Sequence, residues 1–93
     1  MTQIAQIDNR WEISGDVVIG AVPMLLAASK SLSIAQNTTI DFAKVDDIDT
    51  STISLILEWR RRAQKENQQL NFVNLPANLI SLTQLYGVAE LIN

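Results

Sequence analysis

Residues 39–57, TIDFAKVDDIDTSTISLIL, decide the fold because they hold the signals for a strand, a turn and a helix in direct succession. Ile40 and Phe42 lie two positions apart and therefore share one face of a short strand. Residues 46–49 carry aspartates around a single isoleucine, which predicts an acidic turn. The apolar residues that follow recur at helical spacing and predict a helix over 51–65.

Upstream of this stretch, alternating apolar and polar residues predict one or two short strands within residues 2–14. The apolar positions of this pattern are Ile7, Trp11 and Ile13. Ser14-Gly15 predicts a turn at the end of these strands. The nearly uncharged segment that follows contains Pro23, which suits the first turn of a helix because its missing N–H costs nothing there. We expect this helix to cover residues 21–31.

Downstream, Leu70 and Phe72 alternate with polar residues and predict a strand at 69–73. A last helix is expected at 77–86, with Gly87 in the left-handed conformation that often ends a helix. Strands and helices therefore alternate along the whole chain. This order predicts an α/β domain in which helices pack on a mixed or parallel sheet.

Composition narrows the function classes. The 93 residues suffice for one small core, and the formal charge of −3 argues against general nucleic-acid binding, which needs a basic surface. The chain has no cysteine and no histidine, so thiolate chemistry and the commonest general base are excluded. We expect no enzyme activity, no metal and no cofactor. No long apolar run and no secretory signal are visible, so a cytoplasmic location is expected.

The central segments resemble the STAS family, small domains found in anti-sigma-factor antagonists, in anion-transporter tails and in some lipid ABC transporters. The segments that carry the resemblance are Ile40-Asp41-Phe42, Ile48-Asp49-Thr50, Ser51-Thr52-Ile53, Ile13-Ser14-Gly15-Asp16 and the closing residues 79–91. The resemblance covers most of the chain. It implies a single STAS domain at residues 1–93, with a mixed β-sheet whose helices pack mainly on one face, and a non-catalytic role in binding other proteins.

Within the family, the chain looks most similar to the cytoplasmic STAS subunit of Mla-type phospholipid ABC transporters. Asp49 followed directly by Thr50, and the Leu85-Tyr86-Gly87 tail, carry this similarity. It implies binding to the transporter ATPase, within a complex that contains a membrane permease and maintains outer-membrane lipid asymmetry. The chain would then be peripheral to the inner membrane through its partner.

The same resemblance places the partner contact at the start of the second helix. Thr50 would be the main contact, Asp49 would orient the turn, and Ser51 and Trp59 would add area. From the residues alone, Asp49, Thr50 and Ser51 could equally be a helix cap, whose side-chain oxygens accept hydrogen bonds from the free N–H groups of the first turn. The two roles are compatible.

The alternative function is an anti-sigma-factor antagonist regulated by phosphorylation. Antagonists of this kind carry Asp-Ser-Ser-Gly with the phosphate on the second serine, and that position corresponds to Ser51. The glycine that should follow is Thr52 here, and transporter-type subunits also have glycine near this position. The sequence therefore departs from both patterns at residues 51 and 52, and leaves Ser51 as a candidate phosphorylation site.

Two charged clusters remain. Asp46, Asp47 and Asp49 lack the spacing of a calcium loop and are interpreted as a solvated turn. Residues 60–62 are three consecutive arginines, and they point in different directions on a helix. They are interpreted as a solubilising face whose stems cover apolar surface, with contact to an acidic partner or to lipid headgroups as the alternative.

Overall fold

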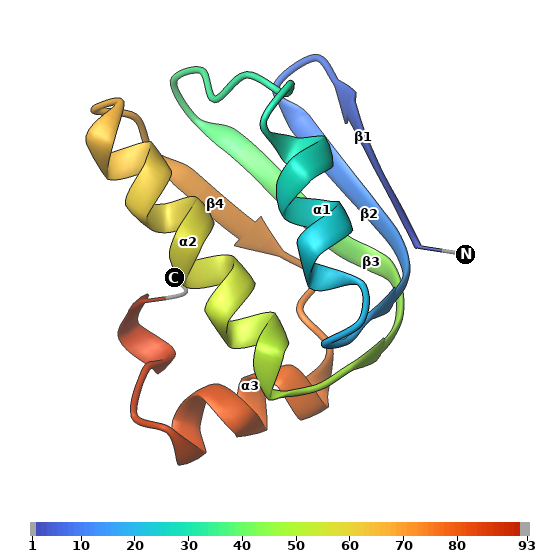
Figure 1. Ribbon diagram of the computed structural model, residues 1–93. Coiled ribbons are helices and arrows are strands. Elements are labelled where there is room, and N and C mark those ends of the chain that lie inside the picture. The colour runs from blue at the N-terminus through green and yellow to red at the C-terminus, as the bar shows by residue number, and fades with distance from the viewer. Residues whose placement is uncertain (1, 92–93) are drawn as a thin grey trace.

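A mixed sheet with helices packed against it forms the fold of the computed structural model, which describes residues 2–91 (Figure 1). Within this range the sheet has four strands in the order β1-β2-β3-β4, with β1 antiparallel to β2 and the other neighbours parallel. The elements along the chain are β1 (Gln3–Ile7), β2 (Arg10–Val17), α1 (Val22–Ser29), β3 (Thr38–Ile48), α2 (Thr50–Lys65), β4 (Leu70–Val73), α3 (Ala77–Leu85) and a short 3-10 helix, η1 (Ala89–Leu91). The α/β class predicted from the sequence is confirmed.

The helices lie mainly on one face of the sheet, where α1 and α2 run side by side and α3 closes one end (Figure 1). The inward residues of the strands and the apolar faces of the helices form one hydrophobic cluster between these layers. Its largest fully buried side chains are Trp11, Trp59, Phe42, Ile13, Leu25, Ile40, Leu55, Ile56 and Leu79. Apart from the aromatic residues, the core is aliphatic.

Two tryptophans stand at the centre of this cluster. Trp11 on β2 and Trp59 on α2 meet edge to face, with ring centroids 5.6 Å apart and planes at 87°. Each indole N–H has a partner, because Trp59 donates to the Ser29 hydroxyl at 2.9 Å and Trp11 donates to the Ser33 carbonyl at 3.2 Å. Burial of each ring contributes about 3 kcal/mol, and the ring pair adds about 1 kcal/mol.

The three arginines of α2 behave differently from one another. Arg62 lies over the Trp11 ring, 5.7 Å from its centroid, and donates to the carbonyl oxygens of Ser29, the last residue of α1, and of Leu32 beyond it. Arg62 also pairs with Glu66, whereas Arg61 pairs only with the exposed Glu58. Arg62 therefore ties the end of α1 to α2, and it is more than a solubilising residue.

The turn predicted at Ser14-Gly15 is wrong, because β2 continues through it to Val17. Gly15 has φ of 85°, a region that favours glycine, and the pairing register with β3 shifts on both sides of it. After Gly15 one residue of β2 lies opposite two residues of β3, Asp46 and Asp47, so the bulge is on β3 and the glycine lies across from it. A sequence pattern alone does not separate a glycine within an irregular strand from a glycine turn.

The chain turns instead at Asp8 and Asn9, where Asp8 has φ of 55°. Ile7 thus belongs to β1 and Trp11 to β2, so the alternative of two strands within residues 2–14 is the correct one, but the shared face of Ile7 and Trp11 is not observed. Ile7 is 54% exposed, while Trp11 is fully buried. The two-residue turn between them breaks the alternation that the pattern assumed.

The acidic turn predicted at residues 46–49 is also wrong for most of its length. Strand β3 extends to Ile48, which is buried and pairs with Val17 of β2. Asp46 and Asp47 are exposed positions of this strand. Asp46 and Asp47 lie at a register shift, between the paired positions Val45 with Gly15 and Ile48 with Val17. Pairing on both sides keeps them in the strand, so tertiary context overrides the low strand propensity of aspartate.

Asp41 is a buried carboxylate in the middle of β3. It accepts hydrogen bonds from the Asn74 side chain at 2.9 Å and the Ala43 N–H at 2.8 Å, and it forms an ion pair with Arg10. Burial raises the pKa of Asp41, but these hydrogen bonds and the Arg10 charge together hold the pKa below its usual value. The Asp41 side chain therefore joins the start of β2 to the residue after β4, on the sheet face opposite α1 and α2.

Gly87 has the predicted role at the end of α3. Its φ is 68°, its N–H donates to the Gln84 carbonyl, and the Val88 N–H donates to the Thr83 carbonyl. This pair of bonds is the Schellman arrangement, in which a left-handed residue closes a helix. The observed α3 ends at Leu85, one residue before the predicted end.

Arg62 and Arg61 form a matched pair for testing the link between α1 and α2. We expect Arg62→Ala to lower the free energy of unfolding by about 2 kcal/mol, because two carbonyls lose a charged donor. Arg61→Ala removes an exposed ion pair and should change stability by less than about 0.5 kcal/mol. Urea denaturation of both variants measures the difference, and equal losses would contradict the structural role of Arg62.

Candidate functional site

The start of α2 lies where several segments of the fold meet. Parallel strands β2 and β3 end beside each other, with Val17 paired to Ile48, and α2 begins directly after β3. The loop from β2 to α1 passes the same place. The carboxyl ends of parallel strands are the usual position for ligand and partner contacts in α/β sheets.

Asp49 is the N-cap of α2 and holds this junction together. One carboxylate oxygen accepts from the Ser51 N–H at 2.9 Å and from the Ser51 hydroxyl. The other oxygen accepts from the Ile19 N–H at 3.0 Å, in the loop after β2. A cap of this kind contributes about 1 kcal/mol, and here it also positions a loop that lies 30 residues away in the sequence.

Thr52 completes the cap from the buried side. Its side chain is fully buried, accepts from the Asp49 N–H at 3.2 Å, and donates to the Val17 carbonyl at 2.6 Å. Asp49 and Thr52 thus form a reciprocal capping box. The structure therefore explains the threonine that stands where the family resemblance predicted glycine: the hydroxyl fastens α2 to the end of β2.

The same contacts determine the ionisation state of the Asp49 carboxyl. The hydrogen bond from Ser51 holds the pKa of Asp49 below its usual value; burial opposes this shift, and the N–H groups of Ile19, Ser51 and Thr52 reinforce it. Asp49 is therefore ionised at neutral pH. The positive end of the α2 dipole favours the ionised form as well.

Thr50, the residue between the two capping partners, is exposed at the first position of α2. Its hydroxyl has no hydrogen-bond partner among residues 2–91, whereas Asp49, Ser51 and Thr52 are all engaged. Ser51 is half-buried against Asp49. Of the predicted contact residues, Thr50 is the one that presents both its methyl group and its hydroxyl to the outside.

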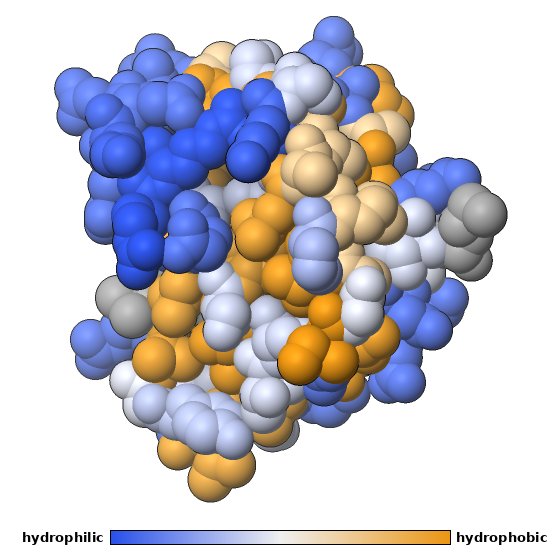
Figure 2. All heavy atoms as spheres, viewed as in Figure 1, coloured by the Kyte–Doolittle hydropathy of each residue, from blue (hydrophilic) through white to orange (hydrophobic). Residues whose placement is uncertain are grey.

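Ile19 is a surface residue of this site that sequence reasoning missed. It is 75% exposed, and the hydrogen bond from its N–H to Asp49 fixes it beside the start of α2. Met24, in the first part of α1, is 42% exposed. Apolar residues gather over the lower half of the helical face in Figure 2, while charged and amide side chains gather at its upper left. The one available signal was an uncharged run from Val17 to Ser29, which looks the same for a core segment.

Trp59 does not belong to this surface. The family resemblance implied that Trp59 adds contact area, but it is 1% exposed and packs against Trp11 in the core. It also lies more than two helical turns from Thr50 along α2. Among residues 2–91, no three aspartate or glutamate side chains lie close enough together to hold a metal ion, and this includes the aspartates at 46, 47 and 49.

Comparison with known proteins identifies the family. The model of the family described as "Mlab, STAS domain" matches residues 1–93. The chain belongs to the STAS family. No curated protein matches this STAS domain in sequence.

Solved structures show the same fold at low sequence identity. The sulfate transporter family protein from Wolinella succinogenes has a TM-score of 0.72 at 15% identity, covering 96% of this chain and 75% of that one. The anti-sigma factor antagonist SpoIIAA in its unphosphorylated form has a TM-score of 0.67 at 15% identity, covering 91% and 83%. Phosphorylated SpoIIAA of Bacillus has a TM-score of 0.68 at 14% identity, covering 97% and 86%. The STAS fold is therefore shared, while function has to be argued from the site.

The lowered pKa of Asp49 predicts acid sensitivity. A carboxyl with a depressed pKa in the folded state adds stability above its unfolded pKa of about 3.9, and that stability is lost as pH falls through the folded pKa. Asn is also a good N-cap, so we expect Asp49→Asn to keep most of the stability at pH 7 and to lose less on acidification than the wild type. Urea denaturation between pH 7 and pH 3 measures this. Parallel curves for the two proteins would contradict a contribution from the Asp49 charge.

The role of Thr52 is tested by two substitutions. Thr52→Val keeps the shape but removes the hydroxyl, leaving the Asp49 N–H and the Val17 carbonyl without a partner, so we expect a loss of about 2 kcal/mol. Thr52→Ser keeps the hydroxyl and should lose about half as much, through the missing methyl group. Thermal and urea denaturation give the order. A valine variant as stable as the serine variant would show that the hydroxyl is not needed.

Proposed function

We propose that this STAS domain is a non-catalytic subunit of an Mla-type phospholipid-transporting ABC complex. It binds the cytoplasmic ATPase and supports assembly and activity of the ATPase in maintaining outer-membrane lipid asymmetry. The description of the matching family and the Asp49-Thr50 pair both support this proposal. As one STAS domain in the cytoplasm, it reaches the inner membrane through its partner. Within residues 2–91, no helix has the length and apolar character needed to cross a membrane.

The observation that carries the proposal is that the polar side chains at the start of α2 differ in their hydrogen bonding. Asp49 and Thr52 use their polar atoms inside the protein, and Thr50 between them uses none. The backbone of an exposed residue held between two fixed ones is already ordered, which lowers the entropy cost when a partner arrives. Thr50 therefore serves as the central contact, with its methyl group packing against the ATPase and its hydroxyl available for a hydrogen bond.

Ile19 extends this contact with an apolar side chain. The bond from its N–H to Asp49 places it on the same platform as Thr50, and exposed apolar groups on a fixed loop suit a protein interface. Ser51 is half-buried and its hydroxyl donates to Asp49, so it contributes only at the edge of the contact. The buried Trp59 is replaced in this proposal by Ile19.

A phosphorylation-regulated antagonist of an anti-sigma factor is the second candidate. The observation that favours it is the contact between the Ser51 hydroxyl and Asp49. A phosphate on Ser51 adds a charge of about −1.5 to −2 next to that carboxylate, which would break the contact and release the loop that Asp49 holds. Thr52 is fully buried, so Ser51 is the better acceptor of the two.

The decisive variant for the transporter function is Thr50→Glu. A carboxylate at the first position of a helix is favourable to the helix dipole, so the fold should keep its stability. The same carboxylate would meet the partner surface without compensation, and we expect at least a tenfold loss of binding. Co-purification of the ATPase and the permease from detergent-solubilised membranes of the native host measures it.

Ala43→Glu is the control, because it adds the same charge at an exposed position of β3 on the side away from α2. It should retain the ATPase. Normal recovery of the ATPase with Thr50→Glu would overturn the proposed contact. Recovery of a kinase-like anti-sigma factor with the wild type, together with one phosphate in its intact mass, would favour the second candidate.

A further inference from the structure

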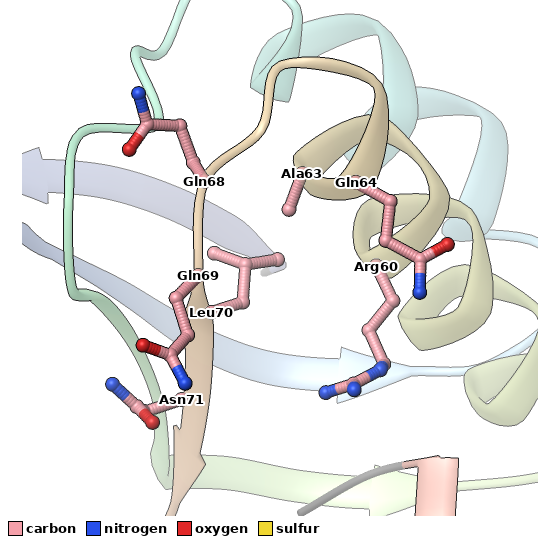
Figure 3. Close-up of a pocket in the computed structure, with 7 residues that line it drawn as sticks. All are labelled: Arg60, Ala63, Gln64, Gln68, Gln69, Leu70 and Asn71. Atoms are coloured by element: carbon pink, nitrogen blue, oxygen red, sulfur yellow. The ribbon is translucent and has the colours of Figure 1, made fainter.

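A polar hollow lies between the second half of α2 and strand β4, away from the site described above. Its volume is about 110 Å³. Figure 3 shows Arg60 extending from α2 into the space beside β4, while Leu70 points from the strand toward the helix. The lining residues are Arg60, Ala63, Gln64, Gln68, Gln69, Leu70 and Asn71.

Strand β4 is an edge of the sheet. Among the described residues it pairs with β3 and with no other strand, so one row of its backbone N–H and C=O groups faces outward. Natural edge strands are commonly protected by lysine, proline or other charged residues. Residues 67–73 contain none of these, and β4 shows no register shift in its pairing. The four residues of β4 therefore have no charged side chain, proline or bulge that would oppose pairing with a further strand.

Arg60 is the positively charged residue beside the β4 edge, and it forms no ion pair with a carboxylate among the described residues. Within residues 2–91, Arg10, Arg61 and Arg62 each form an ion pair with an acidic side chain, and Arg60 forms none. The other residues that line the hollow are all uncharged, and they include Gln64, Gln68 and Gln69. An unpaired guanidinium beside amide donors and acceptors suits a carboxylate together with peptide backbone.

We propose that β4 binds an extended segment of another protein that carries an acidic side chain, which adds to the sheet as a strand beside β4. Backbone pairing with Leu70–Val73 would supply affinity. Alternate side chains of an added strand point to opposite faces. The acidic side chain would point to the helical face and reach Arg60, and its two neighbours would lie beside Gln69 and Asn71.

A second copy of this chain is a poor occupant for the same edge. Pairing of β4 with β4 would bring Arg60 of the second copy to the same edge as Arg60, which is repulsive. It would also bring no carboxylate, because residues 67–73 contain no Asp or Glu. Charge complementarity thus selects an acidic segment of a different protein.

This surface is separate from the Thr50 site. Arg60 lies ten residues after Thr50 on α2, about 15 Å along the helix axis. The proposal therefore does not depend on the transporter function. Binding at β4 and binding at Thr50 can each fail without the other.

The test uses two peptides that differ in charge alone. Acetyl-Thr-Thr-Glu-Thr-Thr-amide and its glutamine counterpart are titrated into the uniformly ¹⁵N-labelled full chain, and amide shifts are followed by NMR. We expect shifts at Leu70–Val73 with both peptides, and about tenfold tighter binding of the glutamate peptide through the charged hydrogen bond. Arg60→Gln should remove this preference, whereas the matched control Arg61→Gln should keep it.

Each contrary result overturns a named part of the proposal. Equal affinity of the two peptides, or a preference that survives Arg60→Gln, overturns the role of Arg60. Shifts elsewhere without shifts at Leu70–Val73, or no shifts with either peptide at millimolar concentration, overturn binding at the β4 edge. A dimer of the free chain in sedimentation, lost on addition of the glutamate peptide, would show that a second copy is the natural occupant.

Discussion

The hydrogen bond from the Thr52 hydroxyl to the Val17 carbonyl is the constraint on which the site depends. It is buried, it joins residues that are 35 positions apart, and it fixes the start of α2 against the end of β2. Asp49 then extends the same junction outward to the loop that carries Ile19. Helix, strand end and loop thus become one rigid unit before any partner is present, and Thr50 lies at its outer surface.

The three arginines of α2 are consecutive in the sequence, but each has different surroundings in the structure. Arg62 is held by carbonyls at the end of α1 and by the Trp11 ring, Arg61 pairs at the surface, and Arg60 is left beside an open strand edge. Successive helical residues lie 100° apart, so consecutive arginines meet different surroundings. The sequence predicted that the three would not form one patch. It had no means to say which of them would be structural.

Sequence patterns predicted the order of the elements and missed some of their boundaries. The periodicity of α2 and α3 and the cap at Gly87 are local properties, and the structure agrees with them to within one or two residues. The length of β3 depends on its pairing with β2, which the sequence pattern does not show. The sequence therefore predicted a turn at the aspartates 46 and 47. The glycine at 15 likewise predicts a turn, since the register shift next to it arises only when β3 pairs with β2.

The same distinction between local signals and long-range contacts applies to the candidate site. By itself the sequence determined that Asp49, Thr50 and Ser51 begin a helix and that they match a STAS segment, because cap residues and apolar periodicity act within a few residues. The tertiary structure decided which of them is available to a partner. It buried Trp59 against Trp11, bonded Thr52 to Val17, and brought Ile19 to Asp49. Exposure depends on contacts between residues some 30 positions apart, and the folded sheet alone brings those residues together.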